Sequence, residues 1–388
     1  MFGDPTVLLI FFLAPIIYPL LFCAIYHNEN VEDMPIAIVD EQPCDVSKRF
    51  IHKLDATPEL SVAYRCNTLG EAQRLLEDHQ VRSIFLFPHD FSTRVAENRT
   101  GRIVVFSDMS SFYYYKAALT GGNAVLIDEM HTIELQRYEQ AGMTNEEASI
   151  QMQPVVMENT TLYNPSGGYG SFFLPILLVL VIHQTLFLGI CILAGEAVES
   201  RRYLQLIPHH LRRNSVYRLI LGRALCYLLL YVPLTIFCFW FVPRWFHLPQ
   251  LGNLYTLLIF ALPLLLAVIF FAMTVANLLV RQKISPMLCF VFLSLVLFML
   301  TGMVWPQQSL PRFWYYFSYI FPSTPAVQGF VKLASMGAPL SEVRHEYLTL
   351  WIQAGSYFVL STLITFAKNY LRQRRNILIH RLRQARNA

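Results

Sequence analysis

The chain has 388 residues, of which 55% are hydrophobic and only 14% are charged. An ordinary soluble domain has about 25% charged residues. A surface this poor in charge must face something other than water, and the mean hydropathy of +0.41 agrees. The composition therefore excludes an ordinary soluble globular protein and indicates a membrane protein with a small formal net charge of +4.

Motifs for metal and nucleotide binding are missing from the sequence. The seven cysteines are scattered without a Cys-x-x-Cys pair, and His345-Glu346 lacks the second histidine of a zinc-binding helix. No Gly-x-x-x-x-Gly-Lys-Ser/Thr motif occurs, so the chain has no phosphate-binding loop. We expect no catalytic residues, metal or cofactor in this chain, and any nucleotide must be bound by another chain.

Six apolar runs are long enough to cross the roughly 30 Å of hydrocarbon in a bilayer, which takes about 20 helical residues. They are Thr6 to Tyr26, Ser171 to Gly195, Tyr217 to Phe241, Leu254 to Val280, Pro286 to Met303 and Leu348 to Phe366. No lysine or arginine precedes the first run, which favours a retained helix over a cleaved signal peptide. The sequence predicts an α-helical polytopic membrane protein with helix 1 in residues 1–27 and helices 2–6 in residues 169–367.

Several of these runs contain prolines, at Pro15, Pro19, Pro175, Pro233 and Pro263. Each proline frees a backbone carbonyl of its own helix, and neighbouring helices can supply the missing donor. We therefore expect kinks at these positions.

Residues 28–168, between the first two runs, have a different composition. They hold 21 of the 26 acidic residues but only 11 of the 30 basic ones, so this segment is near −10 and the rest of the chain near +14. A segment of this length and charge is typical of a folded, water-soluble domain. It is predicted to be inserted between helices 1 and 2.

The pattern within residues 28–168 alternates between strands and helices. Strands are predicted at Pro35 to Asp40, Val81 to Pro88 and Arg102 to Ser107, and helices at Thr68 to His79 and Tyr113 to Gln140. Thr144 with Glu147 then forms a capping box that starts another helix. The sequence predicts an α/β domain followed by a helical hairpin.

The basic residues of the membrane part indicate its orientation. One side holds Arg201, Arg202, Arg212, Arg213, Arg218, Arg281, Lys283, Lys368, Arg372, Arg374, Arg375, Arg381, Arg383 and Arg386, whereas the other holds Arg244, Arg312, Lys332 and Arg344. By the positive-inside rule the first group is cytoplasmic. Both termini are then inside, the α/β domain is extracytoplasmic, and residues 368–388 form a basic cytoplasmic tail. Topology and anionic lipid explain this tail better than nucleic acid does.

Two stretches resemble the permeases of ABC-2 type transporters. Gly195-Glu-Ala-Val-Glu-Ser-Arg-Arg-Tyr-Leu-Gln-Leu-Ile-Pro208, followed by Arg218-Leu-Ile-Leu-Gly-Arg223, is similar to the family's glutamate-led segment after the second span. Thr301-Gly-Met-Val-Trp-Pro306, Ser309-Leu-Pro311 and Phe321-Pro-Ser-Thr-Pro325 look like its re-entrant segment. The outer stretches Ile36-Ala-Ile-Val-Asp40 and Phe87-Pro-His-Asp-Phe91 resemble bacterial members as well.

The resemblance implies a cytoplasmic coupling segment at residues 196–216 that fits a groove on an ABC ATPase. Its expected contact residues are Glu196, Glu199, Arg201, Arg202, Tyr203, Leu204, Leu206, Ile207, Arg212 and Arg213. The alternative is a positive-inside anchor whose arginines hold lipid phosphate. Glutamates, which topology does not require, favour the coupling interpretation.

Three further groups are candidate sites. The polar residues His183, Gln184, Thr185, Ser294 and Thr301 either bond between helices or line a central transport cavity. The residues 305–345 form either an interfacial aromatic belt or a re-entrant outer gate, with Trp305, Pro306, Pro311, Trp314, Phe321 and Pro322 as gate residues. Cys44 and Cys66 either form a disulfide in an oxidising periplasm or remain free thiols.

The resemblance implies a subunit of an ABC exporter in the bacterial inner membrane, moving drugs, lipids or glycolipids. The expected partners are a cytoplasmic ATPase that binds ATP and Mg²⁺, a second permease copy or paralogue, membrane lipids and a periplasmic adaptor, and no nucleic acid. The alternative is a non-transport membrane scaffold or surface receptor of the phage-infection-protein type.

Overall fold

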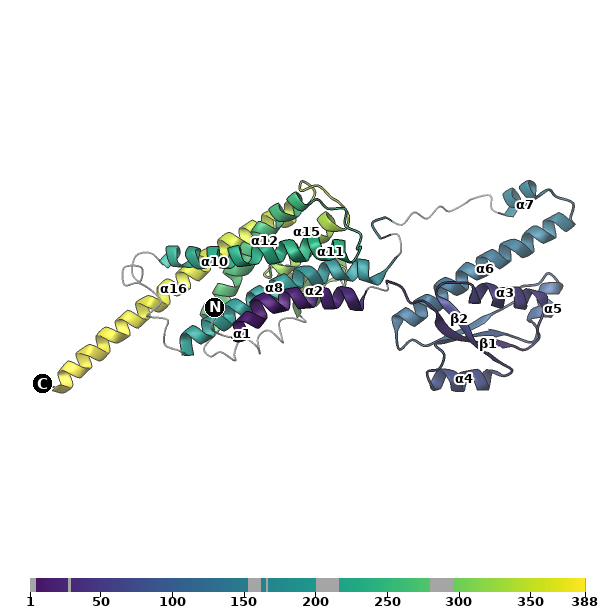
Figure 1. The fold of residues 1–388 in the computed structure, drawn as a ribbon, viewed down its shortest axis with the longest axis horizontal. Coiled ribbons are helices and arrows are strands. Elements are labelled where there is room, and N and C mark those ends of the chain that lie inside the picture. Colours follow the sequence, from purple (N-terminus) through teal and green to yellow (C-terminus); the bar gives the residue numbers. More distant parts are fainter. Residues whose placement is uncertain are drawn as a thin grey trace. The chain divides into compact units, whose positions relative to one another are not determined.

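The computed structural model describes residues 5–26, 29–152, 162–164, 167–199, 216–279, 296–303 and 305–387. The chain forms two compact units. The helical unit comprises Met1–Glu29 and Thr161–Ala388, and the α/β unit comprises Asn30–Thr160 (Figure 1).

The helical unit contains long apolar helices joined by shorter ones. In chain order they are α1 (Pro5–Leu8), η1 (Leu9–Leu13), α2 (Ala14–Ile25), α8 (Tyr169–Glu199), α10 (Val216–Ile236), η3 (Phe237–Phe241), α11 (Val242–Trp245), α12 (Leu254–Leu279), η4 (Gln307–Ser309), α14 (Arg312–Ser318), α15 (Ser323–Ala334) and α16 (Arg344–Asn387). Within the described residues, five stretches are long and apolar enough to cross a membrane: Pro5–Ile25, Tyr169–Val198, Val216–Trp245, Leu254–Leu279 and Arg344–Leu371.

These five stretches agree with five of the six predicted spans. The remaining predicted span, Pro286 to Met303, lies largely outside the described residues, which include only its last part, 296–303. The described residues therefore support a helical membrane protein with at least five candidate spans.

Helix α8 forms the centre of the helical unit. In its most apolar stretch of 18 residues, 89% is buried inside the protein. Helix α8 packs against α2, α12 and α15 (Figure 1). At Gly189 the ring of Phe11 lies directly against the backbone of α8, and a Cβ there would clash with it. A small residue is needed at this crossing because the two helices approach so closely.

Neighbouring groups satisfy two of the carbonyls that prolines free. Pro19 removes the N–H that would bond the carbonyl of Pro15, and the Cys238 thiol of η3 donates to that oxygen at 3.3 Å. Pro243 likewise frees the carbonyl of Phe239, which accepts from the Gln250 side chain at 2.6 Å. The first of these bonds joins α2 to η3.

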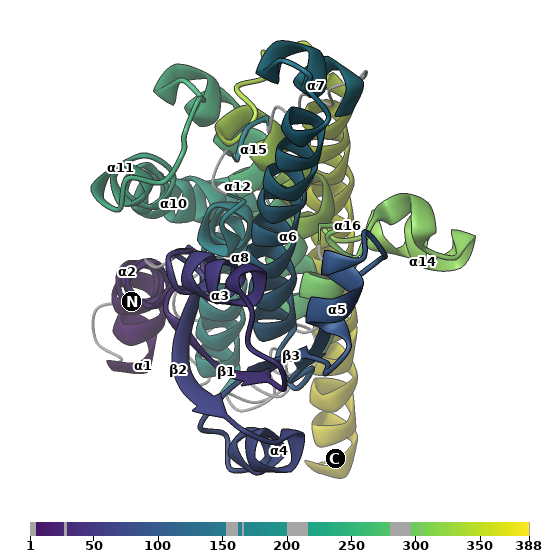
Figure 2. The same cartoon turned by 90° about the vertical axis from the view of Figure 1, so that its right-hand side faces the viewer.

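The α/β unit contains a four-stranded sheet with helices on both faces (Figure 2). Its elements are β1 (Met34–Asp40), α3 (Asp45–Asp55), β2 (Leu60–Cys66), α4 (Leu69–Glu77), β3 (Ser83–Phe87), α5 (Phe91–Ala96), β4 (Val104–Ser107), α6 (Phe112–Gln140) and α7 (Asn145–Met152). The strand order is β2-β1-β3-β4. Strand β1 pairs in parallel with β2 and β3, and β4 is antiparallel to β3.

The predicted strands and helices of this unit are all present. The Thr144 capping box also forms, because the Glu147 carboxylate accepts from the Thr144 N–H at 3.0 Å and the Thr144 hydroxyl accepts from the Glu147 N–H at 3.4 Å. The elements β2, α3 and α5 were not predicted from the sequence. Strand β2 lies at the edge of the sheet and exposes Ala63, Tyr64 and Arg65, so it lacks the strict alternation of a half-buried strand.

Cys44 and Cys66 are both free, so the candidate disulfide is not formed. Cys66 ends β2 and belongs to the core between the sheet and α4, whereas Cys44 packs against the core on the α3 and α6 face. Cys44 is also the N-cap of α3, where its sulfur accepts from the Ser47 N–H at 3.4 Å. The two thiols therefore lie against different faces of the sheet.

Glu129 of α6 links this helix to α3. Its side chain is 3% exposed and contacts Arg49 at 2.8 Å and Lys53 at 2.7 Å. Hydrogen bonds from Lys53 to Asp128 and Glu129 raise the pKa of the Lys53 ammonium group. Glu129 is thus a buried charge that is held by two cations.

We expect Glu129→Ala to lower the free energy of unfolding of the α/β unit by about 2 kcal/mol. The loss is smaller than for a fully buried pair, because water reaches Arg49 and Lys53. Hydrogen–deuterium exchange of α3 and α6 amides in the full chain measures it. The matched control is Asp128→Ala, whose carboxylate is 65% exposed and should matter little. Equal exchange protection in the two variants would contradict a stabilising role for Glu129.

Candidate functional site

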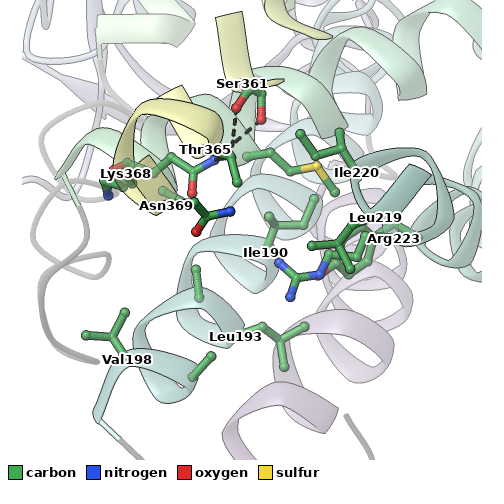
Figure 3. A pocket seen from close by; sticks show the side chains of 16 residues that line it. Ile190, Leu193, Val198, Leu219, Ile220, Arg223, Ser361, Thr365, Lys368 and Asn369 are labelled. Atoms are coloured by element: carbon green, nitrogen blue, oxygen red, sulfur yellow. Dashed lines mark hydrogen bonds between the residues drawn. The ribbon is translucent and has the colours of Figure 1, made fainter. Parts of the chain in front are cut away.

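The helical unit contains a cavity of about 260 Å³ between α8, α10, α12 and α16 (Figure 3). It lies at the end of the unit where α8 and α12 finish and α10 begins. The lining residues are Ile190, Leu193, Ala194, Ala197, Val198, Leu219, Ile220, Arg223, Tyr227, Met273, Ala276, Asn277, Ser361, Thr365, Lys368 and Asn369.

The cavity combines apolar walls with a few polar groups. The α8 wall is aliphatic, whereas α10 contributes Arg223 and α16 contributes Lys368 and Asn369. Figure 3 shows Arg223 and Asn369 extending from their two helices into the space between them. Among the described lining residues there are two cations and no acidic side chain. Such a site suits a molecule with both an apolar part and a hydrogen-bonding or anionic part.

Hydrogen bonds fix α12 to α16 beside the cavity. The Asn277 side-chain amide donates to the hydroxyls of Thr365 at 3.0 Å and Ser361 at 3.4 Å (Figure 3). The Lys368 ammonium group donates to the backbone carbonyl of Asn277. The Thr274 hydroxyl donates to the Tyr357 carbonyl at 3.2 Å on the same pair of helices. Polar bonds of this kind hold membrane helices in register.

The predicted coupling segment starts at this end of the unit. Glu196 is half-buried in the last turns of α8, and Glu199 ends the helix. The other predicted coupling residues lie outside the described residues: Arg201, Arg202, Tyr203, Leu204, Leu206, Ile207, Arg212 and Arg213. The structure therefore places the start of the segment next to the cavity, one helical turn beyond Leu193.

Of the polar residues predicted for a central cavity, the four that the structure describes do not line this one. His183, Gln184 and Thr185 are buried in α8, and the His183 ring lies against Phe187 and Phe271 with centroid distances of 6.5 and 6.4 Å. The Thr185 hydroxyl donates to a carbonyl of its own helix.

The other two residues of that predicted group are Thr301 and Ser294. The buried Thr301 hydroxyl donates to the Phe298 carbonyl at 2.8 Å, and Ser294 lies outside the described residues. Arg223, Asn277 and Lys368, which line the cavity between α8, α10, α12 and α16, were not among the predicted site residues. Their shared position at the same end of three different spans was the signal that could have found them.

The predicted gate residues fall into two groups. Phe321 and Pro322 are buried, whereas Trp305, Pro306, Pro311 and Trp314 are exposed around η4 and α14. Helix α15 is largely buried and is attached to α16 by an ion pair of 2.5 Å between Lys332 and Glu346. Residues 305–343 therefore contain the mostly exposed η4 and α14, followed by the largely buried α15.

The described residues define a multi-pass helical membrane protein with a cavity at one end of its helices and a separate α/β unit. A family model described as ABC-2 family transporter protein matches residues 5–363, so the chain belongs to this family. No curated protein matches the chain. Membership makes the chain a membrane transport component that associates with an ABC ATPase and is not itself catalytic.

Proposed function

We propose that the chain is the permease subunit of an exporter that moves amphipathic molecules, such as drugs, lipids or glycolipids, out of the cytoplasm or the inner membrane. The cavity between α8, α10, α12 and α16 carries this proposal. Its aliphatic wall suits an apolar tail, and Arg223, Lys368 and Asn369 suit a polar head.

Energy would come from a separate ATPase subunit that binds ATP and Mg²⁺. Closure of the ATPase dimer would push on residues 196–216, which begin in the last turns of α8. Because α8 is the buried centre of the helical unit, a displacement of its end would reach α2, α12 and α15 together. A second permease copy or paralogue would complete the transport path, with both termini cytoplasmic in the bacterial inner membrane.

Purification of the full chain from its native membranes in mild detergent tests this function. We expect an ABC ATPase to copurify and its activity to rise when a lysophospholipid or a hydrophobic anionic dye is added. The double variant Glu196→Ala/Glu199→Ala should retain the ATPase but lose most of the stimulation. The matched control is Glu342→Ala, an exposed carboxylate just before α16. If no ATPase copurified with the chain, the result would instead support the function of a scaffold or receptor.

A further inference from the structure

The α/β unit contains a groove of about 560 Å³ between α3, α5, α6 and the loop of residues 98–103. Its apolar floor is formed by Phe50, Phe91, Val95, Leu126, Met130 and Ile133. Ligand pockets in proteins usually measure about 300 to 1,000 Å³ and have mostly apolar walls. The groove has the size and lining of a small-molecule site.

Helix α6 presents an ordered stripe along this groove. Leu126, Met130, Ile133 and Arg137 follow one another at helical spacing, so they lie on one face of α6. Leu126 and Met130 are 38% and 51% exposed, so a ligand in the groove can reach their apolar side chains. The stripe is about 16 Å long. It is apolar along most of its length and cationic at its end.

The loop of residues 98–103 brings two more arginines to the groove. Gly101 packs so closely on α5 that a Cβ would lie 2.9 Å from Val95 Cγ2 and 3.0 Å from Phe91 Cε2. The Arg99 N–H also donates to the Arg94 carbonyl at 2.7 Å, which ties the loop to α5. Arg99 and Arg102 flank Gly101 in this loop, and both line the groove.

The groove is lined by several cationic side chains, although the segment that contains it is net acidic. Residues 28–168 are net acidic, with 21 acidic and 11 basic residues, yet Arg99, Arg102 and Arg137 all line this groove. Arg99 pairs with Glu97 at 3.3 Å, whereas the side chains of Arg102 and Arg137 form no ion pair among the described residues.

Two carboxylates also line the groove. Glu129 is neutralised by Arg49 and Lys53, and Glu134 is the other. The positive charge of Arg102 and Arg137 therefore favours a ligand with an anionic group.

We propose that this groove binds a single-chain amphipathic anion, with the chain along Leu126, Met130 and Ile133 and the anionic head at Arg102 and Arg137. The guanidinium groups would bind a carboxylate or phosphate through charged hydrogen bonds. This site requires no ATPase and no transport step, so it goes beyond the proposed function.

Photo-crosslinking of the full chain in lipid nanodiscs tests the site. The probe is dodecanoate that carries a diazirine in its chain, and the comparison probe is the corresponding primary alcohol. Mass spectrometry of the digested protein locates the crosslinks. We expect saturable labelling of α6 peptides around Met130 by the carboxylate, competed by unlabelled dodecanoate and by dodecyl phosphate, and at least tenfold weaker labelling by the alcohol.

Variants of the arginines and of the apolar floor test separately the binding of the anionic head and of the apolar chain. Arg102→Glu/Arg137→Glu should reduce the affinity for the carboxylate probe more than tenfold. The matched control Arg65→Glu/Arg74→Glu makes the same charge change at exposed residues of β2 and α4 that do not line the groove, and it should bind normally. Met130→Glu, at an exposed helix position, should weaken labelling by both probes.

Hydrogen–deuterium exchange shows that each variant is folded. The proposal would be overturned if the carboxylate and the alcohol labelled the protein equally, or if no saturable label appeared in α6. It would also be overturned if the Arg102/Arg137 and Arg65/Arg74 variants lost the same affinity for the carboxylate probe.

Discussion

Ala194→Trp is expected to reduce substrate stimulation of the partner ATPase, and export in cells, more than tenfold. Ala194 lies on the α8 wall of the cavity of about 260 Å³, so an indole ring would fill the space that the transported molecule needs. Overpacking of a full core costs about 1 to 3 kcal/mol, but here the added ring enters an existing cavity. We therefore expect normal expression and copurification of the ATPase, and a selective loss of stimulation by the lysophospholipid and the dye.

The matched control is Leu225→Trp, which places the same ring on α10 at a side chain that is 56% exposed and does not line the cavity. This variant should behave as the wild type. Full stimulation in Ala194→Trp would show that the transported molecule does not use this cavity.

Replacement of Asn30–Thr160 by a short Gly-Ser linker is expected to abolish export in cells while leaving the basal ATPase activity of the purified complex largely unchanged. The α/β unit has its own two cores, so its removal leaves the packing of the helical unit intact. We propose that ATP coupling uses residues 196–216, which belong to the helical unit. We propose that the α/β unit guides released substrate or docks a periplasmic adaptor.

The linker must leave Glu29 in place. Its carbonyl accepts from the Tyr169 N–H at 3.0 Å, and its carboxylate accepts from the Ser171 hydroxyl, so these contacts connect the end of the first span to the start of α8. The control carries the same linker inserted at Gly142, in the turn between α6 and α7. Full export by the deletion would show that the α/β unit is dispensable, and loss of assembly would show that it is structural.

The sequence by itself determined the features that depend on neighbouring residues in the chain. A membrane-spanning helix must be a continuous apolar run because lipid cannot bond its backbone, and so five predicted spans agree with long helices of the structure. The strands β1, β3 and β4 and the Thr144 capping box were predicted for the same reason. Their signals are local alternation and a local pair of side chains.

Only the tertiary structure decided which side chains meet. Whether Arg223, Asn277 and Lys368 surround one cavity depends on the rotation of three helices about their axes, which hydropathy does not specify. The same holds for Gln250 at the carbonyl freed by Pro243 and for Cys44 and Cys66 on different faces of the sheet. Arg223, Asn277 and Lys368 are distant in sequence, and the packing of whole helices brings them to one cavity.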